Sequence, residues 1–255
     1  MELSNCNAVI TGGASGLGGA TADIIINNGG RVTIIDIQND LGIKKAEELG
    51  SNCNYINIDI TDEDLVSENF SEIVKNTGSI NLAVNCAGIG SPSKVLNKEG
   101  TCSLNLFTKI INVNLIGTFN TLKAAANVMQ NNETRNNESR GVIINTASIA
   151  AYDGQIGQAA YSASKGGIIG MTLPIARELA RQTIRVNTIA PGLFETPLLA
   201  GLPEEAKESL IASTLHPHRL GHPKEYAALV KHIFENEMLN GETIRLDGSL
   251  RMAPK

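Results

Sequence analysis

The chain has 255 residues, of which 42% are hydrophobic; this is enough to bury a substantial core, and we expect one α/β domain over residues 1–255. Its net charge of −5 at pH 7 provides no basic field that would make nucleic acid or an anionic membrane its main partner. No apolar run approaches the ~20 residues that span a bilayer, and a strand-like run beginning near Asn7 predicts neither a signal peptide nor a long Arg-rich presequence.

Strand-like and helix-like segments alternate along the chain, as is typical of βαβ units and of a parallel sheet with helices on both faces. Strands are predicted at residues 7–11, 31–37, 54–58, 80–85, 141–146, 184–189 and 242–246. Helices between them include residues 17–28, 62–76, 114–129, 159–180 and 223–235. The pattern predicts a single-domain, Rossmann-like, doubly wound parallel seven-stranded sheet. Two polar stretches, residues 90–103 and 130–140, are predicted surface loops.

The cysteines show no CxxC spacing and lie in or beside predicted core elements. We therefore expect buried free thiols in a reducing compartment. The four residues are Cys6, Cys53, Cys86 and Cys102.

The first strand runs into TGGASGLG, in which Gly12, Gly16 and Gly18 have the spacing GxxxGxG. Glycine allows the backbone to turn sharply and to approach a pyrophosphate, while the following helix offers free N–H groups and a positive dipole end. A plain tight turn is the alternative. The strand–turn–helix context favours a nucleotide site.

The second predicted strand carries Asp36 about 20 residues beyond the glycine turn, where the adenosine ribose hydroxyls of a dinucleotide lie. Its carboxylate would accept hydrogen bonds from those hydroxyls and repel a 2′-phosphate. Because Ile37 and Gln38 add no cation, the sequence favours NAD over NADP, although a solvated strand-end aspartate is the alternative. Asp59, after the third strand, is a candidate for contact with the adenine edge.

The segment QAAYSASKGG places Tyr161 four residues before Lys165. On a helix these positions share one face, so the phenol and the ammonium point into the same space, and the small neighbouring residues let a flat molecule lie close. Such a pair also arises by chance, so its meaning depends on the rest of the chain.

These motifs, with Asn85-Cys86-Ala87-Gly88, Asn114, Ser148 and Pro191-Gly192, occur in the order and near the spacing of one family. Along essentially its whole length the chain resembles the short-chain dehydrogenase/reductases. The stretches RGVIINTASIAAYDGQIGQAAYSASKGG and TIAPGLFETPLL and the ending NGETIRLDGSLRM resemble, more narrowly, the members that act on 3-hydroxyacyl-CoA and on hydroxysteroids.

The resemblance implies a catalytic set that oxidises a secondary alcohol with NAD. Tyr161 would be the general base, and the acid in reverse. Lys165 and the positive nicotinamide ring would lower the phenol pKa, and Lys165 would also reach the nicotinamide ribose. Ser148 would hold the substrate oxygen, and Asn114 would bind a water that links Lys165 to solvent. As isolated residues, Ser148 and Asn114 would more often be a turn residue and a helix cap.

The resemblance also implies which residues contact the cofactor. They are Gly12, Ser15, Gly16, Leu17, Gly18, Asp36, Asp59, Ile60, Asn85, Cys86, Ala87, Gly88, Tyr161, Lys165, Pro191, Gly192, Phe194 and Thr196. Cys86 would contribute a backbone contact and is not expected to be reactive. Ser148 and Tyr161 would also bind substrate, and Gln155 and Gln158 either border it or are surface amides.

Two further segments are predicted to lie near the substrate. Residues 90–103 occupy the place of an inserted loop beside the active-site mouth, where Lys94 and Lys98 would meet a coenzyme A phosphate or are ordinary solvated lysines. Glu99 stands where another basic residue would strengthen that interpretation. Residues 195–219 resemble a mobile substrate lid.

We expect no metal site, because the chemistry requires none and no acidic or Cys ligand completes a set with the neighbouring histidines. Those histidines are His216, His218 and His222.

The resemblance implies an acyl-CoA or steroid substrate, a homotetramer and a mitochondrial location, with the cytoplasm as the alternative. Two other functions stay open: a dehydrogenase of another secondary alcohol, and a structural subunit of a mitochondrial tRNA-processing complex with a tRNA methyltransferase partner. The acidic net charge predicts no direct nucleic-acid binding.

Overall fold

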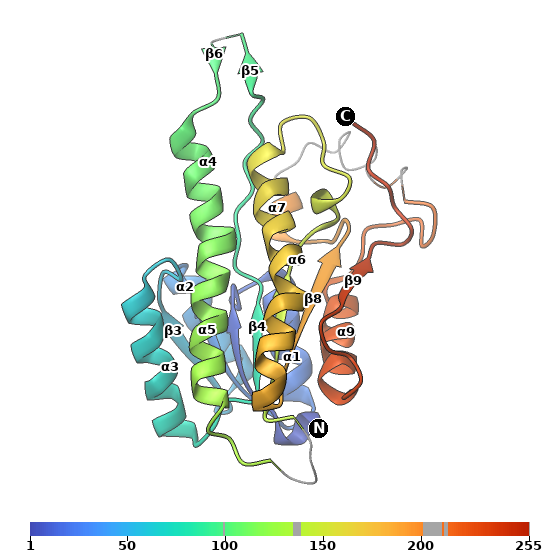
Figure 1. Cartoon of the computed structure of the whole chain (residues 1–255). Helices are drawn as coiled ribbons and strands as arrows, with labels where there is room; N and C mark the ends of the chain where they lie inside the picture. The colour runs from blue at the N-terminus through green and yellow to red at the C-terminus, as the bar shows by residue number, and fades with distance from the viewer. Residues whose placement is uncertain (99, 135–138, 201–210, 212–213, 255) are drawn as a thin grey trace.

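The computed structural model of the chain describes residues 1–98, 100–134, 139–200, 211 and 214–254 (Figure 1). A seven-stranded sheet lies at its centre, with the strand order β3-β2-β1-β4-β7-β8-β9 and every neighbouring pair parallel. This confirms the predicted Rossmann-like, doubly wound sheet. The strands are β1 Asn7–Thr11, β2 Arg31–Asp36, β3 Cys53–Asn57, β4 Leu82–Asn85, β7 Gly141–Thr146, β8 Ile184–Pro191 and β9 Thr243–Leu246.

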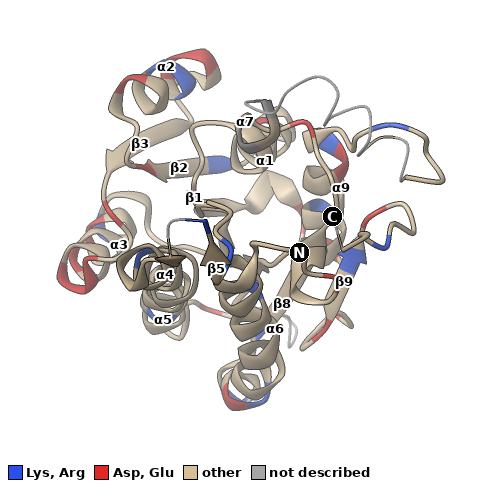
Figure 2. Ribbon diagram, turned by 90° about the horizontal axis from the view of Figure 1, so that it is seen from above, with Lys and Arg blue, Asp and Glu red and all other residues tan. Residues whose placement is uncertain are grey.

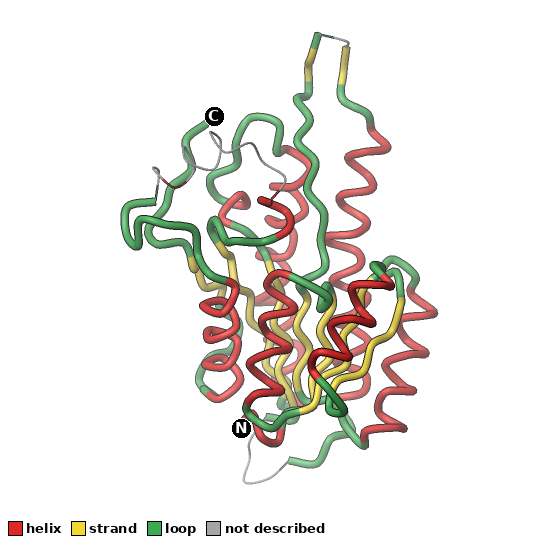
Figure 3. Tube along the Cα trace, turned by 180° about the vertical axis from the view of Figure 1, so that it is seen from behind, coloured by secondary structure: helices red, strands yellow, loops and turns green. Residues whose placement is uncertain are grey.

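Helices cover both faces of the sheet, as the view from above shows (Figure 2). One layer contains α1 Gly16–Asn27, α2 Asn39–Leu49 and α9 Pro223–Glu235, and these helices lie in front of the strands in the view from behind (Figure 3). The opposite layer contains α3 Glu63–Thr77, α5 Gly117–Met129 and α6 Ala159–Leu179. Among the described residues, no helix is both long and apolar enough to cross a membrane.

Two hydrophobic clusters fill the space between the sheet and its helix layers. Successive strand residues alternate between them: Ile10 and Ile34 pack toward α1 and α9, whereas Val9 and Ile35 pack toward α3 and α5. Because both faces are covered, the central strands are buried throughout and their sequences are nearly continuous apolar runs.

The predicted polar loop at residues 90–103 is partly structured. It contains the short antiparallel pair β5 Leu96–Asn97 and β6 Gly100–Thr101, which projects beyond the body of the molecule (Figure 1). It is followed by α4 Leu104–Ile111, which the sequence analysis missed although Leu104, Phe107 and Ile110 fall at helical spacing. A π-helical turn, η2 Asn112–Ile116, joins α4 to α5, so the helix predicted from residue 114 begins earlier.

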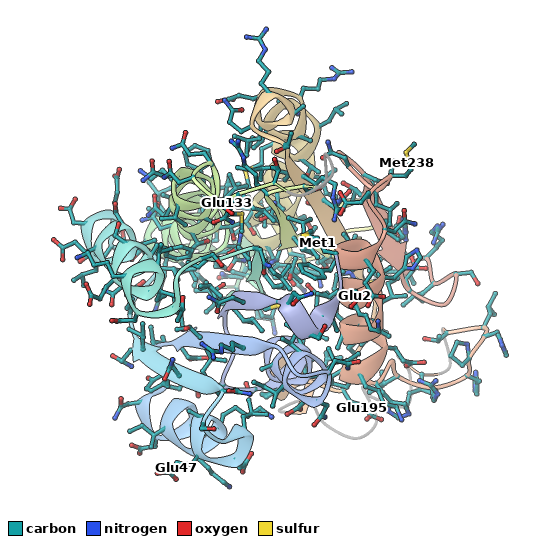
Figure 4. All side chains as sticks on the ribbon, turned by 90° about the horizontal axis from the view of Figure 1, so that it is seen from below. Met1, Glu2, Glu47, Glu133, Glu195 and Met238 are labelled. Carbon is teal, nitrogen blue, oxygen red and sulfur yellow. The ribbon has the colours of Figure 1, made fainter. Side chains whose placement is uncertain are left out.

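A buried arginine organises the end of the sheet opposite the carboxyl ends of the strands. Arg185 on β8 is 5% exposed. Its guanidinium donates to the main-chain oxygens of Ile233, Phe234, Asn236 and Leu239, which follow or end α9. In the view from below, the labelled Met1 lies near the centre of this end; its amino group pairs with Glu237 at 3.5 Å (Figure 4).

Candidate active site

The glycine turn lies between β1 and α1, packed against the ends of β2 and β4. Gly12 has a φ of +64°, and a Cβ there would lie 2.8 Å from the Ala87 nitrogen. A Cβ on Gly18 would lie 2.8 Å from the Gly12 carbonyl carbon and nearer still to its oxygen. Ser15 precedes α1 in an extended conformation and its side chain makes no capping bond. The turn is therefore compact and presents the amino end of a helix, as an anionic ligand requires.

Asp36 lies at the carboxyl end of β2, beside this turn. The residue is 8% exposed, and its carboxylate accepts hydrogen bonds from the main-chain N–H groups of Ala14 at 3.2 Å and Gln38 at 3.0 Å. The nearby cation Lys45 is paired with Asp23 at 2.6 Å. The strand end thus presents a carboxylate that keeps acceptor positions for a ligand.

The segment after β4 closes the next side of the site. The Asn85 amide donates to Asn145 at 2.8 Å and accepts from Thr121 at 2.7 Å, so this side chain is engaged inside the fold. Ile60 is 5% exposed, whereas Asp59 is exposed and accepts from the N–H of the following Thr61. Leu17 lies in the first turn of α1, partly buried against the core.

Three predicted catalytic side chains come together at the carboxyl end of β7. Ser148 precedes the 3₁₀ turn η3 Ile149–Ala151 and accepts a hydrogen bond from Ala150 N at 3.1 Å. Tyr161 and Lys165 lie in the first turns of α6, and the Ser148 hydroxyl lies near enough to the Tyr161 phenol to favour its charged form. The Lys165 ammonium lies 5.7 Å from the centre of the Tyr161 ring and donates to the main-chain oxygen of Thr146 at 2.7 Å.

Burial dominates the protonation of this cluster. It raises the pKa of Tyr161 above 10, and the Ser148 hydroxyl partly opposes that rise. It also lowers the pKa of Lys165 to about 8. Here the Lys165 ammonium is bonded to Thr146, and the loss of water around the phenol sets the direction of its pKa. The expectation that Lys165 and the nicotinamide ring together lower that pKa concerns the complex with the cofactor and stays a prediction.

Asn114 lies in the π-helical turn and is fully buried. Its Oδ1 accepts from Ile89 N at 2.8 Å, and its Nδ2 donates to Ile89 O at 2.9 Å and to Ser164 Oγ at 3.0 Å. A Cβ on Gly88 would lie 3.2 Å from Asn114 Oδ1 and 3.5 Å from Lys165 Nζ. The structure thus brings Asn114 and Gly88 to the lysine, with both amide N–H donors already used.

The segment after β8 borders the site, although its members face different ways. Gly192 N donates to Leu246 O at 2.9 Å, which continues the pairing of Pro191 with β9. Phe194 is 6% exposed and packs into the core. Thr196, by contrast, lies against the glycine turn, because a Cβ on Gly16 would be 3.6 Å from its Cγ2. Of these residues, Thr196 is the one whose side chain approaches the proposed phosphate position.

Gln155 and Gln158 serve the local structure. Gln158 Oε1 accepts from Gln155 N at 3.0 Å, and Gln155 Nε2 donates to Ala253 O at 3.0 Å. A residue that the sequence analysis missed stabilises the same region: Arg245 donates to Asp153 at 2.6 Å. Its guanidinium also stacks over the Tyr152 ring at 4.9 Å. The available signal was an arginine between the apolar strand residues Ile244 and Leu246.

The lid and loop hypotheses fall only partly on described residues. Glu99 and residues 201–210 and 212–213 of the lid lie outside them, whereas Lys94 and Lys98 are described and exposed. His218 Nδ1 lies 2.9 Å from Thr214 O, and His222 Nδ1 lies 3.0 Å from Glu195 Oε2. In the described part of the chain, no three His, Cys, Asp or Glu side chains are placed to hold a metal ion. All four cysteines are free; two of them, Cys86 and Cys102, are only partly buried.

A glycine turn after the first strand and a serine, tyrosine and lysine grouped at the carboxyl end of a central strand define one class of enzyme. A family model described as short chain dehydrogenase matches residues 6–207. The chain therefore belongs to the short-chain dehydrogenase family, and it is an oxidoreductase of a family that uses NAD(P).

Individual relatives narrow the comparison. The chain is 52% identical over 249 residues to the 3-hydroxyacyl-CoA dehydrogenase type-2 of Bos taurus, covering 97% of this chain and 95% of that protein. It is 49% identical to the Drosophila melanogaster protein of the same name, covering 99% and 100%. The crystal structure of 3-hydroxyacyl-CoA dehydrogenase type-2 from Mycobacterium avium superimposes with a TM-score of 0.93, at 37% identity, covering 99% and 98%.

Proposed function

We propose that this protein is an NAD-dependent dehydrogenase that interconverts 3-hydroxyacyl-CoA and 3-ketoacyl-CoA. The observation that carries the proposal is the grouping of Ser148, Tyr161 and Lys165 beside the glycine turn, in a chain similar over nearly its full length to proteins named for this reaction. When bound, oxidised NAD would accept the hydride that leaves the alcohol carbon.

The chain's own residues would bind the substrate oxygen and transfer the proton. Ser148 would donate to that oxygen and hold it beside the Tyr161 hydroxyl, near which the Ser148 side chain lies. Tyr161 would take the hydroxyl proton, and Lys165 would supply positive charge that favours the phenolate. Burial alone raises the phenol pKa, so the tyrosine becomes an effective base only once further positive charge, such as that of oxidised NAD, lies beside it. Asn114 would help to place a water near Lys165. Its amide is occupied by Ile89 and Ser164, and its main-chain oxygen accepts from Thr118 Oγ1 at 2.7 Å.

The preference for NAD over NADP rests on Asp36. A carboxylate held by two main-chain N–H groups has spare lone pairs for ribose hydroxyls and would repel a 2′-phosphate. The test is Asp36→Ala, with Asp23→Ala as the control, because Asp23 is a nearby aspartate that pairs with Lys45. We expect Asp36→Ala to reduce the ratio of NADH to NADPH efficiency by about tenfold or more. An unchanged ratio would show that Asp36 does not determine the preference for NAD over NADP.

The coenzyme A part of the proposal concerns Lys94 and Lys98, which are exposed before and within the projecting β5–β6 pair. The measurement compares NADH oxidation with acetoacetyl-CoA, with free acetoacetate and with a ketosteroid. We expect acetoacetyl-CoA to have the highest kcat/KM, and Lys94→Ala/Lys98→Ala to raise its KM but not that of the ketosteroid. An equal kcat/KM for free acetoacetate would refute the CoA assignment, while the protein would still be a dehydrogenase.

The oligomer is a separate proposal, a homotetramer. Apolar side chains are exposed along the continuous α4–η2–α5 helix and on α6: Leu104 at 74%, Phe107 at 36%, Ile116 at 45%, Phe119 at 43% and Leu173 at 44%. Light scattering should give a mass four times that of the chain. A monomer would contradict the proposal. A mitochondrial location stays a proposal by similarity alone.

A further inference from the structure

A buried ring of three hydroxyl and thiol groups lies behind the catalytic lysine. Tyr226 OH and Thr146 Oγ1 are 2.7 Å apart. Thr146 Oγ1 donates to Cys86 Sγ at 3.5 Å, and Cys86 Sγ donates to Tyr226 OH at 3.7 Å. With Tyr226 donating to Thr146, each member donates once and accepts once, so the three groups form a closed cycle.

Tyr226 comes from a distant part of the chain. It lies in the first turn of α9, 80 residues from Thr146, and its side chain is completely buried in the cluster beneath α1 and α9. A phenylalanine would fill the same space, so packing alone does not account for the hydroxyl. Burial holds the pKa of Tyr226 well above its usual range and raises that of Cys86, so both groups are neutral at physiological pH.

Thr146 connects this ring to the lysine. Its hydroxyl belongs to the ring, while its main-chain oxygen accepts the bond from Lys165 Nζ at 2.7 Å. The ammonium is a compact cation on a flexible stem, so its place depends on fixed acceptors. Thr146 O is the acceptor that holds it, and the ring restrains the residue to which that oxygen belongs.

We propose that Tyr226 is a positioning residue: by holding Thr146, it fixes the carbonyl that anchors Lys165 beside Tyr161. This inference rests on the proposed function, because it assigns the lysine its role in dehydrogenation. Tyr226 touches neither Lys165 nor Tyr161 in any described hydrogen bond and acts through Thr146.

The consequence concerns the charge of the lysine. A carbonyl that accepts from an ammonium favours the charged form, so loosening it lowers the pKa of Lys165 further. The titratable groups around the ammonium are Tyr161 on α6, Cys86 after β4 and Tyr226 on α9. All three are neutral at pH 7, so Lys165 is the group whose protonation changes when the Thr146 carbonyl is loosened.

The test titrates Lys165 directly in the apoprotein, by ¹³C NMR of lysine labelled at the ε carbon, with the signal assigned from Lys165→Met. Wild type should titrate near 8. Tyr226→Phe should titrate lower, by about half a pH unit or more. Thr146→Val should do the same, and the double variant should shift no further than either single one, because both break the same ring. The matched control is Thr172→Val. Thr172 lies on α6, as Lys165 does, and this change removes its buried hydroxyl, which lies 2.6 Å from that of Thr188 on β8.

A second readout follows the reaction. In the oxidation of 3-hydroxybutyryl-CoA, the rise of kcat with pH should move to higher pH in Tyr226→Phe and stay in place in Thr172→Val, because a displaced lysine favours the phenolate less. Equal lysine titrations in wild type, Tyr226→Phe and Thr172→Val would overturn the inference. A wild type that titrates as expected but leaves 3-hydroxybutyryl-CoA untouched would refute the proposed function, while the NMR comparison would still decide the role of Tyr226.

Discussion

Two adjacent glycines at the start of α1 allow a matched test of the nucleotide turn. A Cβ on Gly18 would overlap the Gly12 carbonyl, whereas a Cβ on Gly19 would find its nearest neighbour, Gly13 O, at 3.6 Å, an ordinary contact. Both changes to alanine improve helix propensity by up to ~1 kcal/mol. Only Gly18→Ala must also displace backbone, at a cost of about 1–3 kcal/mol by analogy with overpacked cores. We therefore expect Gly19→Ala to be neutral or stabilising, and Gly18→Ala to lose about 1–2 kcal/mol.

The displaced backbone is the turn itself, so nucleotide binding should fall along with stability. Isothermal titration with NADH should show Gly18→Ala weakened by about tenfold or more and Gly19→Ala close to wild type. Urea unfolding followed by circular dichroism suits a chain without tryptophan and gives the stability of both variants. If Gly18→Ala matches Gly19→Ala in both experiments, the compact packing of the turn does not constrain this site and the argument is wrong.

Two further predictions concern buried cations. Arg185→Met leaves main-chain oxygens at and after the end of α9 without their donor, so it should lower the free energy of unfolding, measured in urea, by about 3–5 kcal/mol. The control Arg31→Met, at an exposed position, should change it by less than about 0.5 kcal/mol. A small loss for Arg185→Met would contradict its structural role. Burial lowers the pKa of Lys165 from 10.5 to about 8, so between these values the unfolded chain binds the additional proton. The destabilising effect of burying this charge is fully present below pH 8 and is relieved as pH rises toward 10.5. The stability of Lys165→Met relative to wild type should therefore decline over that range, and a constant difference would show that the lysine titrates normally.

Buried parallel strands were the easiest feature to predict. The strands at Asn7–Thr11 and Gly141–Thr146 match the prediction to the residue, because strands covered on both faces are continuous apolar runs. Helix α4 was missed because it follows a polar, partly exposed hairpin and carries only one buried side chain, Ile110. Its eight residues make only about two turns, too short a run for the helical spacing to stand out beside that hairpin.

Side-chain direction could not be predicted from motif order. Asn85 falls within a cofactor motif, yet its amide is bonded inside the fold, and Phe194 packs into the core. The bond between Tyr226 and Thr146 joins residues 80 positions apart and depends on how α9 docks on the sheet. Such relations arise from tertiary packing, which residue spacing does not encode.

The central claim is that Tyr161 transfers the proton in an NAD-linked dehydrogenation. Tyr161→Phe keeps the ring and removes the hydroxyl, so NADH binding and the unfolding midpoint should stay close to wild type. The most direct measurement is NADH oxidation at about 340 nm, the absorbance band of the reduced nicotinamide, with acetoacetyl-CoA. The account predicts wild-type turnover and a loss of about 10²-fold or more in kcat for Tyr161→Phe. A Tyr161→Phe variant that turns over at the wild-type rate would contradict it.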